Sequence, residues 1–308
     1  MIKVDLITGF LGSGKTTFLK KYAKYFMDQG KRVGILENDF GAVNVDMMLL
    51  SELRGDKCEL EMVAGGCDAD CHRRRFKTKL IAMGMSGYDR VIIEPSGIFD
   101  VDEFFDAIHE EPLDRWYEVG NVIAIVDAGL REDLSVTGQY YLASQLAHAG
   151  QIVFSRVQLT TPEELEKTEE IIENAAKTVH LERDLKSAYL QKDWEKLTEE
   201  DWKGIASCEY RGASYIKLQA VRESDFESIC MLELPMNTAM LKEKLPALFA
   251  QEAYGHIFRI KGFYEEAGSW YEVNATSSEL QIEPILVGQQ VLIVIGEGLD
   301  ETGIRELL

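Results

Sequence analysis

The segment GFLGSGKT at residues 9–16 constrains the fold of this chain more than any other part of its sequence. It fits the pattern G-x-x-x-x-G-K-[ST] in full. It follows the apolar run IKVDLIT (2–8) and opens KTTFLKKYAKYFMDQG (15–30), whose apolar residues have helical spacing. A strand, a glycine-rich turn and a helix in this order indicate a phosphate-binding loop rather than an ordinary turn, because backbone N–H groups and the helix N-terminus together hold an anion. The sequence therefore predicts a nucleoside triphosphate site.

Each part of this loop has a predicted task. Gly12 and Gly14 let backbone N–H groups turn toward a phosphate. Lys15 reaches the β- and γ-phosphates, and the Thr16 hydroxyl is a ligand for Mg²⁺. Lys15 is therefore also a predicted catalytic residue.

Acidic residues end two further apolar runs. VIIEPSG places Glu94 after three apolar residues and ends at Gly97, which can approach a γ-phosphate, while LENDFGAVNVD carries Glu37 and Asp39. Open α/β sheets bind ligands at the carboxyl ends of their strands. We therefore expect Glu94 and Asp39 to join Thr16 at the Mg²⁺ site rather than to be ordinary surface acids. Glu37 and Asp39 are also the candidates for orienting the attacking water, which completes the predicted catalytic set.

The apolar runs predict the fold class. Short buried-type strands alternate with helical segments, a pattern typical of a mainly parallel sheet with helices on both faces. The predicted strands are 2–8, 32–39, 89–97, 121–127 and 150–155. A further helix is expected over 161–179, with Thr161 as its N-cap and Pro162 in its first turn.

The pattern changes near residue 222, and we predict two domains, 1–215 and 222–308. The second reads as a smaller α+β domain with strands in SICMLELP, HIFRIKGFYEE, SWYEVNATSS and QQVLIVIGEG. NTAMLKEKLPALFAQ reads as a helix interrupted or kinked at Pro246, and DETGIRELL as a short closing helix. The polar stretch 183–215 has weak periodicity, and its Trp194 and Trp202 suggest local packing without a defined place.

The charge and cysteine content of the chain limit which classes of partner and which cellular compartment we expect. The formal net charge of −20 repels phosphate backbones and anionic lipid, so neither nucleic acid nor membrane is an expected partner. We expect no leader segment, because MIKVDLITGF has no charged start followed by an apolar segment, and no stretch approaches the roughly 20 apolar residues of a membrane helix. An odd number of unevenly spaced cysteines favours a reducing cytoplasm over a disulfide framework. These five are Cys58, Cys67, Cys71, Cys208 and Cys230.

Three segments taken together resemble a known family: GFLGSGKTT, ENDFG with the following NVD, and the cysteine-bearing GGCDADCH before IIEPSG. They are similar to the CobW-type metallochaperone GTPases, relatives of UreG and HypB. RIKGF and IGEGLDETGIRELL also resemble that family's C-terminal domain. The resemblance implies a nucleotide-hydrolysing switch that delivers a metal or a corrinoid cofactor to a metalloenzyme or corrinoid-protein client. It places Asp39 on a switch loop and Glu94 in the Walker B role, and it leaves homodimer formation open.

The sequence departs from the family at its base-reading motif. Where the family has NKxD, the chain has Ser155, Arg156, Val157 and Gln158. The Asp of that motif accepts two hydrogen bonds from guanine, and a neutral Gln amide accepts less strongly than a carboxylate. Both GTP and ATP therefore remain candidates. The predicted nucleotide-binding residues are Gly9, Gly12, Ser13, Gly14, Lys15, Thr16, Thr17, Gly97, Ser155, Arg156 and Gln158.

The cysteine segment and the switch loop also differ from the family. Instead of C-x-C-C the chain has Cys67 followed by Cys71 four residues later, and NEFGE is replaced by a segment with Asp39 and Ala42. Cys67, Cys71 and His72 could bind Zn²⁺ or Co²⁺, because thiolate and imidazole suit borderline divalent ions. The alternative is a solvent-exposed loop with two reduced thiols.

Two functions of different classes follow. The first is a Mg²⁺-dependent NTPase that acts as a metallochaperone or metallocofactor maturation factor. The second is a nucleotide-gated regulatory module with little hydrolysis, which the altered base-reading and cysteine motifs suggest.

Overall fold

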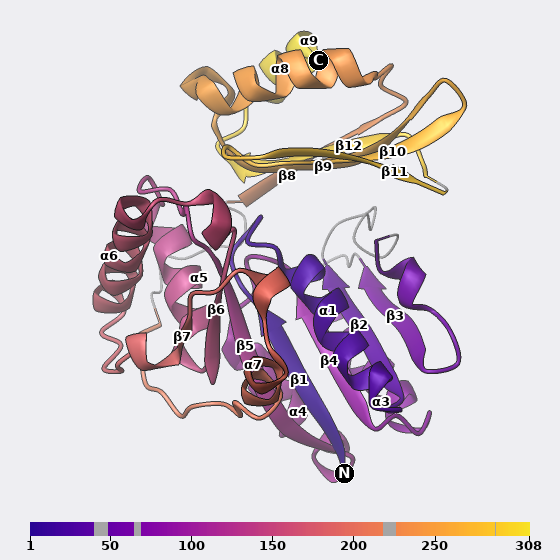
Figure 1. Ribbon diagram of the computed structural model, residues 1–308, viewed down its shortest axis with the longest axis vertical. Coiled ribbons are helices and arrows are strands. Elements are labelled where there is room, and N and C mark those ends of the chain that lie inside the picture. The colour runs from indigo at the N-terminus through magenta and orange to yellow at the C-terminus, as the bar shows by residue number, and fades with distance from the viewer. Residues whose placement is uncertain (40–48, 65–68, 218–225, 287) are drawn as a thin grey trace. The chain divides into compact units, whose positions relative to one another are not determined.

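The computed structural model (Figure 1) describes residues 1–39, 49–64, 69–217, 226–286 and 288–308. The chain divides into two compact units, residues 1–221 and residues 222–308. No helix in the described part of the chain has the length and apolar character needed to cross a bilayer.

The first unit contains one seven-stranded sheet in the order β3-β2-β4-β1-β5-β6-β7. Every neighbouring pair is parallel, which confirms the predicted fold class. The strands are β1 (Ile2–Thr8), β2 (Val33–Asp39), β3 (Cys58–Ala64), β4 (Arg90–Pro95), β5 (Tyr117–Asp127), β6 (Gln151–Ser155) and β7 (Tyr189–Leu190). Of these, β3 and β7 were not among the predicted strands.

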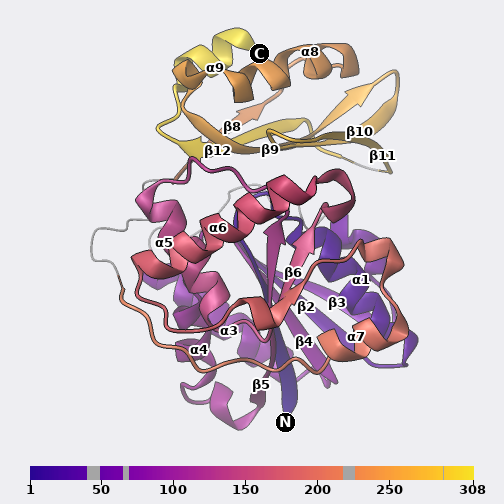
Figure 2. The same cartoon turned by 60° about the vertical axis from the view of Figure 1, so that its left-hand side comes forward.

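Helices lie on both faces of this sheet (Figures 1 and 2). They are α1 (Lys15–Asp28), α3 (Ala69–Gly84), α4 (Val101–Ile108), α5 (Val136–Ala147), α6 (Pro162–Thr178) and α7 (Glu199–Ile205). Short 3-10 turns lie at Ser51–Leu53, Leu113–Arg115, Val157–Leu159, Lys186–Ala188 and Trp194–Lys196. The predicted start of α6 is confirmed, because the helix begins at Pro162 and the Thr161 hydroxyl before it accepts from the Glu164 N–H in a capping box.

One apolar cluster joins α1 and the stretch 190–208 to the same sheet face. Phe18 of α1 packs against the rings of Trp194 and Trp202. The strands contribute alternate residues, such as Ile123 and Ile125 of β5, because successive strand side chains point to opposite faces. Tertiary packing thus gives the polar stretch 183–215 a place that its own weak periodicity could not indicate.

A buried polar cluster holds β1, α1, β4 and β5 together. Asp5, which is 0% exposed, accepts hydrogen bonds from the Tyr22 hydroxyl at 2.7 Å and from the backbone N–H of Asn121 at 2.8 Å. The Arg90 guanidinium also pairs with this carboxylate. The Asn121 amide donates in turn to the Tyr22 hydroxyl at 2.8 Å. The cluster satisfies a fully buried charge, as burial requires.

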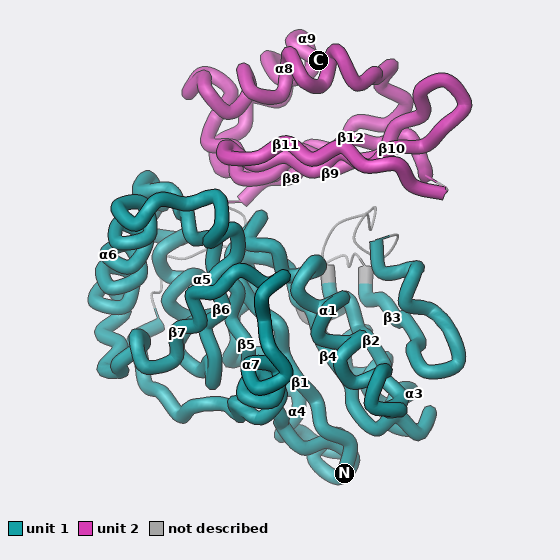
Figure 3. Tube along the Cα trace, in the orientation of Figure 1, with its two compact units in different colours: residues 1–221 teal, residues 222–308 magenta. Residues whose placement is uncertain are grey.

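The second unit (magenta in Figure 3) is a five-stranded antiparallel sheet in the order β11-β10-β9-β12-β8. Its elements are β8 (Phe226–Leu232), α8 (Thr238–Ala250), β9 (His256–Glu266), β10 (Ser269–Ala275), β11 (Leu280–Ile285), β12 (Val291–Glu297) and α9 (Glu301–Leu307), with a 3-10 turn at Glu252–Tyr254. β11 was not among the predicted strands. Of the predicted interruption or kink at Pro246, the interruption is not seen, since one helix runs through that residue, and the kink stays a prediction.

The strand order explains where a ligand would bind in the first unit. The chain leaves β1 for β2 on one side and leaves β4 for β5 on the other, although β1 and β4 are neighbours. The loops after these two strands therefore meet at the carboxyl edge of the sheet, at a topological switch point.

Candidate nucleotide-binding site

The loop after β1 has the backbone geometry of a phosphate cradle. Gly14 is the N-cap of α1 with a φ of 96°, and Gly9 has a φ of 147°. A Cβ on Gly9 would lie 2.3 Å from the Ile125 carbonyl oxygen, so only glycine fits there. The Lys15 ammonium, 7% exposed, donates to the Gly9 carbonyl at 2.9 Å and thus lies inside the loop. A cation and a helix N-terminus are brought together where an anion would bind.

The hydroxyl of Thr16 donates to Glu94 Oε1 at 2.7 Å, and both side chains are buried. Thr16 is in the first turn of α1, and Glu94 is near the end of β4. A hydroxyl and a carboxylate oxygen side by side fit the ligands that Mg²⁺ prefers, beside waters and phosphate oxygens. The two residues predicted for this ion therefore adjoin each other.

The other predicted acids lie on β2. Glu37 is buried and stands in register with Glu94 on the adjacent strand, so their carboxylates belong to the same level of the sheet. Asp39 is the last residue of β2, and its side chain lies outside the described part of the chain. Its predicted role on Mg²⁺ stays a prediction.

Gly97 lies directly against the phosphate-binding loop. A Cβ there would be 2.7 Å from the backbone N of Leu11, and the Gly97 carbonyl accepts from Gln145 Nε2 at 2.8 Å. Of the remaining loop residues, Ser13 is buried and its hydroxyl has no hydrogen-bond partner among the described residues, while Thr17 is exposed on α1.

The segment in the base-reading position touches the loop through its arginine. Arg156, in the left-handed region with a φ of 56°, donates to the Gly12 carbonyl at 3.0 Å and pairs with Asp127 at 2.6 Å. Ser155 is buried at the end of β6, whereas Gln158 is exposed in the following 3-10 turn. The structure thus brings Ser155 and Arg156 beside the loop and leaves Gln158 at the surface.

Two residues beside the loop were not identified from the sequence. Asp127 at the end of β5 holds Arg156. Trp194 donates from its indole N–H to the Phe154 carbonyl at 2.9 Å, and its ring edge is 3.3 Å from a Cβ built on Gly14. Asp127 could have been found as an acid ending an apolar run. Trp194 carries no such local signal.

The cysteine segment is described only in part. Cys67 lies outside the described residues, while Cys71 and His72 are in the first turn of α3. His72 is buried, with its Nε2 2.6 Å from Asn38 Oδ1 on β2. Within the described ranges no group of three or more His, Cys, Asp or Glu side chains is arranged to hold a metal ion. The predicted transition-metal site therefore stays a prediction.

Two further thiols are buried packing residues. Burial raises the pKa of Cys58 to about 11 and the pKa of Cys208 to about 12. Both therefore stay protonated at neutral pH, and a protonated thiol is a poor metal ligand and nucleophile.

Comparison of this sequence with known proteins identifies the family to which it is related. The nucleotide-binding domain model of CobW/HypB/UreG matches residues 3–181. The zinc chaperone YeiR of Escherichia coli (strain K12) is 30% identical over 164 residues, which are 53% of this chain and 49% of that protein. The zinc chaperone YjiA of the same organism is 30% identical over 169 residues, 51% of this chain and 50% of that protein.

A solved structure, the Zn(II)-bound YjiA GTPase from E. coli, aligns with 99% of this chain and 97% of its own at 22% identity, with a TM-score of 0.35. The chain spans about half the length of the curated relatives it matches. The matched region contains β1 from its second residue onward, the glycine-rich loop, Glu94 and the Ser155–Arg156 segment. The chain belongs to the CobW/HypB/UreG family, through its nucleotide-binding domain.

Proposed function

We propose that this chain binds a nucleoside triphosphate with Mg²⁺, hydrolyses it, and uses the cycle to deliver a metal, zinc in the first place, to a client protein. The observation that carries the proposal is the Thr16–Glu94 hydrogen bond beside the buried Lys15, inside a glycine-rich loop at the helix N-terminus. This arrangement provides cationic, hydroxyl and carboxylate groups for a triphosphate and its metal ion.

The side chains have separate tasks in this proposal. Lys15 exchanges its carbonyl partner for the β- and γ-phosphates. Thr16 and Glu94 would hold Mg²⁺, which supplies neutralisation of the charge that develops on the phosphate oxygens. Glu37, buried beside Glu94, orients the attacking water, with Asp39 as the second candidate. Backbone N–H groups of the loop hold the phosphates in place.

The hydrolysis is tested by turnover assays with GTP and ATP in Mg²⁺. Lys15→Ala and Glu94→Gln should each lower kcat by about 10²-fold or more, because each removes a group that stabilises transition-state charge. Lys20→Ala is the matched control, since Lys20 is on the same helix but pairs with Glu52. Turnover in the two site variants equal to that of wild type would contradict the assignment.

The base is a separate question, and we propose GTP with ATP as the competitor to test. Arg156 is beside the loop, but the Gln158 amide replaces a carboxylate. Gln158→Asp should raise the preference for GTP over ATP by about tenfold, since a charged acceptor strengthens the hydrogen bonds from guanine. Equal competition by ATP and GTP in both proteins would contradict this role for position 158.

The metal is the part that relatives support, since YeiR and YjiA are named zinc chaperones. We propose that Cys67, Cys71 and His72 bind Zn²⁺, with Co²⁺ as the alternative. Competition with a chromophoric chelator should show weaker Zn²⁺ binding in the double variant Cys67→Ser, Cys71→Ser. Cys230→Ser is the control, because Cys230 is in the second unit. Unchanged affinity in the double variant would remove these cysteines from the site.

The client in this proposal is a cytoplasmic metalloenzyme or corrinoid protein. The second candidate function, a regulatory module with little hydrolysis, is favoured by the replaced base-reading carboxylate and by the altered cysteine motif. Tight nucleotide binding with turnover no faster than that of Lys15→Ala would select it.

A further inference from the structure

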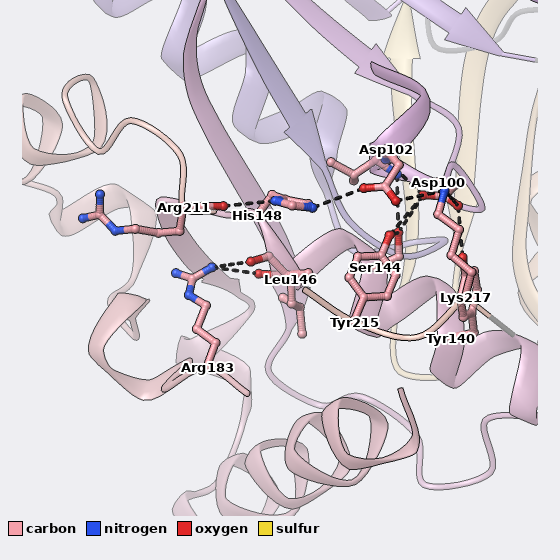
Figure 4. A network of polar contacts seen from close by, with 12 residues as sticks. Asp100, Asp102, Tyr140, Ser144, Leu146, His148, Arg183, Arg211, Tyr215 and Lys217 are labelled. Carbon is pink, nitrogen blue, oxygen red and sulfur yellow. Dashed lines mark hydrogen bonds and ion pairs between the residues drawn. The ribbon is translucent and has the colours of Figure 1, made fainter. Parts of the chain in front are cut away.

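Residues 211–217, which we call the strap, lie over α4 and α5 and come just before the second unit in the chain (Figure 4). Two backbone hydrogen bonds hold the strap. The Arg211 N–H donates to the His148 carbonyl at 3.0 Å, and the Ile216 N–H donates to the Val179 carbonyl at 2.8 Å. The remaining contacts of the strap are made with side chains at the start of α4 and on α5.

Asp100 is the centre of these contacts. Its carboxylate accepts from the hydroxyls of Tyr140 at 3.0 Å, Ser144 at 3.2 Å and Tyr215 at 3.2 Å. It also caps α4 by accepting from the Asp102 N–H at 3.0 Å. A strap residue and two residues of α5 therefore hold the same carboxylate.

A second set of contacts runs beside the first. The Lys217 ammonium is 2.9 Å from Asp102 and 3.6 Å from Asp100. His148 of α5's C-cap lies between the strap and α4, with Nδ1 3.0 Å from the Arg211 carbonyl and Nε2 3.2 Å from Asp102. The strap is thus bound to α4 directly through Lys217 at one end, and through His148 as an intermediary at the other.

The same stretch of chain reaches the phosphate-binding loop. Asp100 ends the β4–α4 loop, residues 96–100, which begins two residues after Glu94. Within it, Gly97 abuts the backbone of Leu11, and Gln145 of α5 holds the Gly97 carbonyl. A hydrogen bond joins Thr16 to Glu94, the chain runs from Glu94 through Gly97 to Asp100, and a second hydrogen bond joins Asp100 to Tyr215 of the strap.

We propose that Tyr215 and Lys217 are positioning residues, which hold the β4–α4 loop through Asp100 and thereby couple the terminal phosphate to the strap that leads into the second unit. The proposal rests on the proposed nucleotide function. Gly97 lies against the backbone of Leu11 in the phosphate-binding loop, and in the proposed nucleotide function it is the residue that approaches the γ-phosphate, which only a triphosphate has. Asp100 is three residues further along a short chain segment, so a shift at Gly97 displaces the carboxylate that Tyr215 and Lys217 bind. Coupling of this kind is reciprocal, so loosening the strap weakens triphosphate binding.

Tyr215→Phe tests the coupling with minimal change, because it removes one hydroxyl and keeps the ring contacts to Tyr140 and His148. The matched control is Tyr189→Phe, since the buried Tyr189 hydroxyl has no hydrogen-bond partner among the described residues. Binding of the non-hydrolysable analogue GMPPNP with Mg²⁺ should weaken about fivefold or more in Tyr215→Phe, while GDP binding stays unchanged. Lys217→Met should act in the same direction, and Tyr189→Phe should change neither affinity.

Amide hydrogen exchange measures the opposite direction of the coupling, namely the effect of the nucleotide on the strap. In wild type, the Arg211 and Ile216 amides should exchange more slowly with GMPPNP than with GDP, and Tyr215→Phe should abolish that difference. A role confined to stability would alter exchange equally with both nucleotides.

The outcomes separate the two proposals. The coupling alone is overturned if wild type binds and hydrolyses GTP but Tyr215→Phe and Lys217→Met leave the ratio of GMPPNP to GDP affinity unchanged. Equal loss of both affinities also overturns it. Wild type that binds no nucleotide removes the proposed function and the coupling with it.

Discussion

Gly97 shows how one residue joins two loops at the carboxyl edge of the sheet. It follows Glu94 in the chain and lies against the backbone of Leu11 in the phosphate-binding loop. The sequence marked this glycine because a γ-phosphate needs a close backbone approach. The structure adds a second reason, because no side chain fits between the two loops.

We therefore expect Gly97→Ala to cost about 1–3 kcal/mol of unfolding free energy, because backbone atoms of Leu11 must move to admit the methyl group. Gly204→Ala in α7 is the matched control: nothing lies within 4 Å of its added Cβ, and it should gain about 0.5–1 kcal/mol. Urea unfolding measures both. Equal stability of Gly97→Ala and wild type would contradict the packing described here.

Among the elements, β1, α1, β4 and β5 share one buried charge. Asp5 is not exposed at all, and its partners come from three other elements. From the sequence, a single aspartate such as Asp5 gives no sign that it is buried with partners. The cluster around Asp5 could therefore not be predicted. Its partners are up to 116 positions away.

Arg90→Met should lower the unfolding free energy by about 3–5 kcal/mol, because it leaves the buried Asp5 carboxylate without its cation. Lys3→Met removes a cation from the exposed Lys3–Glu118 pair nearby on the sheet and should cost at most about 1 kcal/mol. Chemical denaturation compares them. Similar small losses for both variants would show that the Asp5–Arg90 pair contributes no more than a surface ion pair.

The contact between Asp102 of α4 and His148 at the C-cap of α5 predicts an acid dependence. The hydrogen bond from His148 is the main cause that lowers the pKa of Asp102 to about 2. The unfolded value is about 3.9, so this contribution to stability is complete above that pH and is lost as the pH falls toward about 2. Asp102→Asn should therefore be less stable than wild type at neutral pH. Between about pH 4 and pH 2 its unfolding free energy should also fall less steeply. Parallel slopes for the two proteins would count against the His148–Asp102 interaction.

At the scale of the whole molecule, the excess of acidic side chains produces a net electrostatic repulsion that affects stability. The chain has 53 acidic and 33 basic residues and a net charge of −20. Many of its cations are already engaged in ion pairs, such as Lys20 with Glu52 and Lys186 with Glu173. The remaining negative charges repel one another in the folded state more than in the expanded unfolded chain.

Raising NaCl from about 0.02 M to about 0.3 M should therefore raise Tm, by roughly 2–4 °C for each kcal/mol of repulsion that is screened. Differential scanning calorimetry measures the shift. KCl should have the same effect at equal ionic strength, because the cause is screening rather than a bound ion. A Tm that stays constant or falls would contradict a stability set by net repulsion.

The sequence alone determined the elements with strong local signals. Strands β1, β2, β4, β5 and β6 each contain a short apolar segment, and Thr161, Pro162 and an early glutamate mark the start of α6. The phosphate-binding loop was also predictable, because its glycines, Lys15 and Thr16 act through their own backbone and their immediate neighbours. Local chemistry was sufficient for these features.

Other features were decided only in the tertiary structure. β3 alternates glutamates with apolar residues, and β7 has two residues that are a strand only because they pair with β6. Trp194 and the strap residues have no sequence neighbour that indicates their contacts, since each partner comes from a distant part of the chain. The sequence determined that a phosphate could be held at the start of α1. Long-range packing decided what surrounds it, because a contact between distant residues depends on the path of the whole chain between them.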